Sequence, residues 1–85
     1  MTRTSRHAML RAGQRLGLRR DVCVTLRDIW QRGRQAKPID FPHFGQMAQR
    51  GYEYRVCTYQ HATVLIVRAR DVDEFVTVIK GNERG

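Results

Sequence analysis

Three side chains near the N-terminus recur at a spacing of four residues: His7, Arg11 and Arg15. On a helix this spacing forms one polar stripe about 12 Å long, because each residue rises about 1.5 Å along the axis. Two guanidinium groups beside one imidazole suit the size and charge of a phosphate group. The stripe is therefore a candidate site for phosphate chemistry.

Metal-independent cleavage of RNA needs a base for the 2′-hydroxyl proton, cations for the crowded phosphorane and an acid for the leaving 5′-oxygen. His7 can act as the base or the acid, because histidine titrates near neutral pH. Arg11 and Arg15 can stabilise the phosphorane. The alternative is that the stripe is simply the solvated face of an amphipathic helix.

The net charge of +8 is unevenly placed along the 85 residues. Residues 1–39 contain ten cations and two acids, whereas residues 40–85 contain six of each, so the whole excess belongs to the first half. Fourteen of the sixteen cations are arginine, whose planar fork binds phosphate bidentately. This asymmetry predicts a surface that binds a polyanion such as RNA, with Arg6, Arg19 and Arg20 as further candidate contacts. The alternative is that these arginines only keep two amphipathic helices in solution.

Tyrosines alternate along residues 52–59, where Tyr54 precedes Arg55. Aromatic side chains next to cations often hold unpaired bases of RNA. Tyr54 and Arg55 are therefore candidate nucleic-acid contacts, although tyrosines at such positions also serve as ordinary packing residues.

Other kinds of site are not indicated. Glycine-rich phosphate loops, paired carboxylates and Ser-His-Asp arrangements are missing. Cys23 and Cys57 are too few and too far apart for a disulfide framework or a zinc site, and the three histidines have no metal-ligand spacing. We therefore expect neither a metal nor another cofactor, and two reduced cysteines that pack as small apolar residues.

Two helices are predicted in the first half of the chain. The first runs from Ser5 to Leu16, with Thr4 or Ser5 as its N-cap and a glycine as its C-terminal stop. The second follows Asp21 as N-cap, carries an apolar stripe that includes Trp30, and ends at Gly33. Because the connection between them is short, the helices should fold back on each other as a hairpin.

Three strands are predicted in the last third: Tyr52 to Tyr59, Ala62 to Arg68, and Glu74 to Lys80. The middle one is apolar on both faces and should be central. Gln60-His61 predicts a tight turn after the first strand, and Arg70 to Asp73 a longer connection. The expected fold class is α+β, with the helical hairpin packed on a three-stranded antiparallel β-meander.

The chain is expected to form a single domain, 1–85, made of a helical hairpin at 5–33, a loop at 34–51 and a sheet at 52–80. The loop has no sustained period but contains Phe41, His43 and Phe44, so it is a candidate surface for a protein partner. No segment resembles a signal peptide or a membrane span, which predicts a cytoplasmic protein without a membrane partner.

Several short segments resemble a group of small bacterial and phage proteins, which is similar to the RelE-type and colicin-D-type ribonuclease toxins. In the helical half, the similar segments are Ser5-Arg6-His7-Ala8 with Arg11 and Arg15, Gly17-Leu18 and Asp21-Val22. In the sheet, they are Tyr54-Arg55-Val56, Val64-Leu65-Ile66-Val67 and Val76-Thr77-Val78.

The resemblance implies N-terminal helices on an antiparallel sheet and a metal-independent endoribonuclease. It places Thr77 in the catalytic site with His7, Arg11 and Arg15, and Tyr54 and Arg55 in the same cleft. Three functions thus remain open from the sequence: a toxin-type ribonuclease, a non-catalytic nucleic-acid-binding module, and a small phage-type effector that binds and modulates a host protein.

Overall fold

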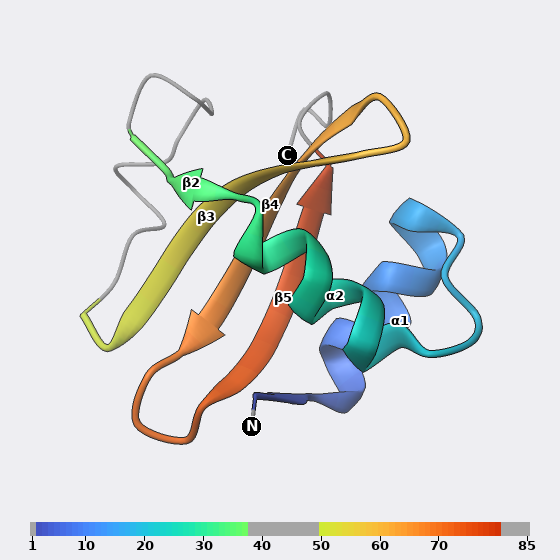
Figure 1. Ribbon diagram of the computed structural model, residues 1–85. Helices are drawn as coiled ribbons and strands as arrows, with labels where there is room; N and C mark the ends of the chain where they lie inside the picture. The colour runs from blue at the N-terminus through green and yellow to red at the C-terminus, as the bar shows by residue number, and fades with distance from the viewer. Residues whose placement is uncertain (1, 38–49, 81–85) are drawn as a thin grey trace.

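The structure is a computed structural model that describes residues 2–37 and 50–80 (Figure 1). Its elements are, in chain order, β1 (Arg3–Thr4), α1 (Arg6–Leu16), α2 (Val22–Gln31), β2 (Arg34–Gln35), β3 (Tyr52–Tyr59), β4 (Ala62–Ala69) and β5 (Glu74–Lys80). The α+β fold class is therefore confirmed.

The sheet has five strands in the order β1-β5-β4-β3-β2. The three long strands lie where the alternating pattern predicted them, and β4 pairs antiparallel with both β3 and β5. The expectation of a three-stranded sheet was wrong, because β1 pairs parallel with β5 and β2 pairs antiparallel with β3. The sheet is thus mixed, with one very short strand at each edge.

Both helices lie on one face of the sheet, where they bury the main apolar core (Figure 1). Leu26, Ile29 and Trp30 of α2 pack there with Phe75 of β5 and with the apolar side of β4. Ala8 and Ala12 of α1 are fully buried in the same core, because small side chains let this helix lie close to the sheet. The opposite face has a second, smaller cluster: Ala36, Leu65 and Val67, with Tyr54, Val56, Val76 and Ile79 packed against it.

The helices do not form the tight hairpin that their short connection predicted. α1 packs mainly along β5, whereas α2 crosses over β3 and β1, and the two helices contact each other at few positions. α1 turns Ala8 and Ala12 toward the sheet and leaves Met9 and Leu10 exposed, whereas the buried residues of α2 all lie in the core on the sheet.

The ends of α1 follow the sequence prediction. The Ser5 hydroxyl accepts a hydrogen bond from the backbone N–H of Ala8 at 3.0 Å, as an N-cap does. Gly17 adopts a left-handed conformation with φ 70°, and its N–H donates to the carbonyl of Gly13. Asp21 differs from the prediction, because its carboxylate makes no capping hydrogen bond and only its backbone carbonyl starts α2.

The prediction of a loop over 34–51 was wrong at its start, where Arg34 and Gln35 form β2. A strand of two residues has no alternating pattern that a sequence could reveal. Residues 38–49, which include Phe41, His43 and Phe44, lie outside the described residues. The predicted turn at Gln60-His61 is confirmed, since both residues have positive φ angles between β3 and β4.

Gly33 follows α2 at a point where the chain passes very close to β3. A Cβ atom at this position would lie 2.5 Å from Cys57 Sγ and 3.0 Å from the carbonyl oxygen of Val56. Only a residue without a side chain fits, so Gly33 allows α2 and β2 to meet β3. In the described part of the chain, no helix is long and apolar enough to cross a membrane.

Gly33→Ala should lower the free energy of unfolding by about 1–3 kcal/mol, because the added methyl group must displace β3 or α2. Gly13→Ala is the matched control: its Cβ would meet only ordinary contact at 3.4 Å, and alanine favours a helix by about 0.5–1 kcal/mol over glycine. Urea denaturation of both variants measures this difference. Equal stabilities would show that the close approach at Gly33 is absent.

Candidate nucleic-acid interface

α1 lies along the outer edge of β5 and is fastened there at both ends. The hydroxyl of Ser5 donates to the Val76 carbonyl at 3.4 Å, and the Arg15 Nη1 donates to the Val78 carbonyl at 2.7 Å. These two carbonyls belong to the residues immediately before and after Thr77. The helix that carries the polar stripe is therefore held beside the strand segment that carries Thr77.

His7, Arg11 and Arg15 do lie along α1 as predicted, but the stripe winds around the helix axis. A step of four residues advances a helix by about 40° more than one full turn. His7 is accordingly exposed, whereas Arg11 and Arg15 are half-buried and Arg15 reaches β5. The Nη1 of Arg11 donates to Gln14 Oε1 at 2.8 Å, which orients its guanidinium on the helix surface.

Thr77 is half-buried and lies opposite Val67 in the register of β4 and β5. Directly paired residues of antiparallel strands share a face, and Val67 belongs to the cluster on the face away from the helices. The Thr77 side chain therefore lies on that face. The structure brings Arg15 to the backbone next to Thr77, but the Thr77 side chain lies on the face of the sheet away from α1 and its polar stripe.

The other predicted contacts are distributed over several surfaces. Arg6 is exposed in the first turn of α1, and Arg19 and Arg20 are exposed in the connection between the helices. Tyr54 and Arg55 are successive residues of β3 and so lie on opposite faces of the sheet. Tyr54 packs in the second cluster and Arg55 lies under α2, so these two side chains do not line one cleft.

Arg55 belongs to a cluster around Trp30 that the sequence reasoning missed. The guanidinium carbons of Arg55 and Arg68 lie 4.5 Å and 5.4 Å from the Trp30 ring centroid, and Phe75 meets the same indole edge-on at 5.5 Å. Arg55 also donates through Nη1 to the Trp30 carbonyl at 3.0 Å. The Glu53 carboxylate binds both guanidinium groups, Arg55 Nε at 3.1 Å and Arg68 Nη2 at 2.7 Å.

Asp73 extends this cluster to the N-terminal segment. Its Oδ1 accepts from the Thr2 hydroxyl at 2.8 Å and from Arg68 Nη1 at 3.2 Å. The hydrogen bond from Thr2, and then the charge of Arg68, hold the pKa of the Asp73 carboxyl below its ordinary value. The alternation of β3 places Glu53 and Arg55 on one face, and this was the only sequence signal that pointed to the cluster.

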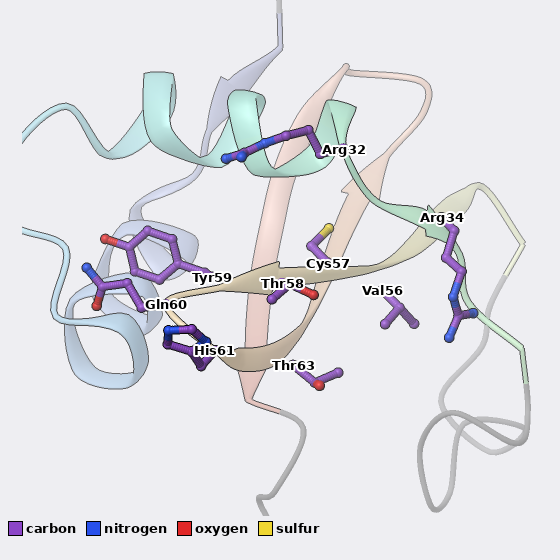
Figure 2. Close-up of a pocket in the computed structure, with 9 residues that line it drawn as sticks. All are labelled: Arg32, Arg34, Val56, Cys57, Thr58, Tyr59, Gln60, His61 and Thr63. Carbon is purple, nitrogen blue, oxygen red and sulfur yellow. The ribbon is translucent and has the colours of Figure 1, made fainter.

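A recess of about 850 Å³ runs along the outer edge of β3. It is lined by Arg32, Arg34, Val56, Cys57, Thr58, Tyr59, Gln60, His61 and Thr63. In Figure 2 Arg32 extends from the end of α2 toward the end of β3 that carries Tyr59, whereas Arg34 points to the other side. Among the described residues β2 pairs only with Arg55 and Val56, so the last three residues of β3 form a free sheet edge.

Cys57 is buried beneath the end of α2, and burial raises the pKa of its thiol to about 11, while the charge of Arg55 opposes this shift. The raised pKa keeps the thiol neutral over the physiological range. Within residues 2–37 and 50–80, no group of three His, Cys, Asp or Glu side chains is placed to hold a metal ion.

No protein family, curated protein or solved structure matches this chain. The site must therefore be interpreted from its own geometry.

A thiol reagent at pH 8 should modify Cys23 much faster than Cys57, since only about one Cys57 thiol in a thousand is ionised three units below its pKa. Cys23 is half-buried, lines an open pocket, and its thiol donates to the Thr2 carbonyl at 3.2 Å. The Cys23→Ser variant isolates Cys57: it should react slowly when folded and quickly in guanidinium chloride. Rapid modification of the folded variant would contradict the burial of Cys57.

Proposed function

We propose that this chain is an RNA-directed protein of the ribonuclease-toxin type, which binds RNA along α1 and cleaves it without a metal. The observation that supports this function best is the arrangement of α1. The helix exposes His7, carries Arg11 one turn further along with its guanidinium bound to Gln14, and is fixed to β5 through Arg15. In this proposal an RNA phosphate binds Arg11 and lies next to the imidazole one turn away on the same helix.

In this proposal His7 takes the proton from the 2′-hydroxyl group, which then attacks the adjacent phosphorus. Arg11 stabilises the negative charge of the phosphorane, and the 5′-oxygen leaves with a proton from solvent. Arg15 positions the helix, because one of its guanidinium nitrogens is bound to β5. Exposed Arg6, Arg19 and Arg20 extend the cationic surface along which the RNA backbone lies.

A second candidate is non-catalytic RNA binding, and the position of Thr77 favours it. Its side chain lies on the face away from the main core, so a threonine hydroxyl and His7 do not form one compact catalytic group there. The cationic surface on α1 supports binding in both cases.

Total bacterial RNA incubated with the protein in EDTA should be cleaved, and His7→Ala should reduce the rate roughly 100-fold or more. His61→Ala is the matched control, since His61 is also exposed but lies in the turn between β3 and β4. A denaturing gel reads the fragments. Equal cleavage by the parent and His7→Ala would remove His7 from the mechanism, and intact RNA with a folded parent would leave only binding.

Binding to a single-stranded RNA should weaken steeply with salt, with a logarithmic slope of about 0.7 for each phosphate contact. Arg11→Ala should weaken binding and reduce the slope by about 0.7, the value of one phosphate contact. Arg70→Ala removes an exposed arginine after β4 and should leave both the affinity and the slope unchanged. Fluorescence anisotropy at several salt concentrations measures the slopes. Identical slopes for the two variants would show that α1 does not face the RNA.

A further inference from the structure

A separate pocket of about 430 Å³ opens next to the only tryptophan of the chain. Its lining residues come from the N-terminal segment, from α2 and from the two neighbouring strands: Thr2, Arg27, Trp30, Gln31, Arg55 and Arg68. The lining is thus cationic, neutral polar and aromatic. It contains none of the residues of the α1 stripe.

The charge of this pocket is positive, because three guanidinium groups line it and only two carboxylates lie behind them. The carboxylates that bind two of these groups, those of Glu53 and Asp73, are not part of the lining. Glu53 instead fixes Arg55 and Arg68 from beside the indole ring. An entering anion therefore meets arginines whose orientation is already set.

Arg27 differs from the other two arginines. In the described part of the chain it has no ion pair, and its Nε is buried without a hydrogen-bond partner. The Nε of Arg68 is also buried and unpartnered. Both Nε atoms are closed to solvent, so a ligand in the pocket reaches these arginines through their terminal Nη groups. Arg27 gains charge-assisted hydrogen bonds when an anion binds there, because no described residue accepts from it.

We infer that this pocket binds a phosphate monoester, with Arg27 as its principal contact and Arg68 as the second. A phosphate dianion offers several acceptor oxygens to the planar forks of two arginines, more than a single carboxylate does. The side-chain amide of Gln31 supplies a neutral donor, whereas the Thr2 hydroxyl is already donated to Asp73. The phosphate belongs either to a terminal group of RNA or to a free small molecule.

Trp30 reports on this pocket directly, because no other tryptophan contributes to the fluorescence. Inorganic phosphate, titrated at constant ionic strength, should change the Trp30 emission in a saturable way with a midpoint of about 1 mM or below. Arg27→Gln should raise this midpoint at least about tenfold, because it removes a charged hydrogen-bond donor. Arg70→Gln, at an exposed position outside both the pocket and the α1 surface, should leave the midpoint unchanged.

The result is independent of RNA cleavage, since Arg27 lies outside the α1 stripe. A linear response of the parent, or equal effects of Arg27→Gln and Arg70→Gln, would overturn the assignment by showing general ion screening. Arg27→Lys tests the role of the planar guanidinium, and urea denaturation confirms that each variant is folded.

Two oligoribonucleotides distinguish the sources of the phosphate. Tighter binding of a 5′-phosphorylated than of a 5′-hydroxyl oligoribonucleotide, lost in Arg27→Gln, assigns the phosphate to RNA. Equal binding of the two oligoribonucleotides, with phosphate saturation retained, assigns it to a free small molecule.

Discussion

The contact between Trp30 and the arginines of the sheet is the interaction on which the rest of the structure depends. The indole packs against Phe75 of β5 and lies next to guanidinium groups from β3 and β4, so a single side chain of α2 joins three strands. Glu53 prevents the two neighbouring cations from repelling each other by binding both of them. The position of α2, and with it the close approach at Gly33, follows from this arrangement.

The fold was predictable from the sequence wherever a periodic pattern extended over many residues. The apolar stripes defined α1 and α2, and the alternation around Tyr54 and the apolar run in β4 defined the long strands. The two edge strands were missed, because β1 and β2 each contain only two residues and owe their conformation to the partner strand. The prediction of a helical hairpin was wrong for a related reason. The length of the connection between two helices does not show whether each helix packs on the other helix or on the sheet.

The candidate site was predictable only in its local part. The spacing of His7, Arg11 and Arg15 correctly placed them on one helix, but the hydrogen bond from Arg15 to Val78 joins residues far apart in the chain. The cluster around Trp30 was hidden for the same reason, because Arg55 and Arg68 reach the indole only after the sheet has formed. Tyr54 and Arg55 are neighbours in the sequence, which suggested that they act together. Side-chain alternation along β3 instead places them on opposite faces of the sheet.

The attachment of α1 to β5 has a consequence for self-association. An uncovered edge strand can pair with the edge of another molecule, and this is a common start of aggregation. Ser5 and Arg15 occupy carbonyl groups on the β5 edge, so a second chain finds that edge already in use. Among the described residues, the opposite edge is open at the end of β3, and Arg32 and Arg34 line the recess there. Two copies that approached edge to edge there would bring their own cations together, so like-charge repulsion favours separate molecules.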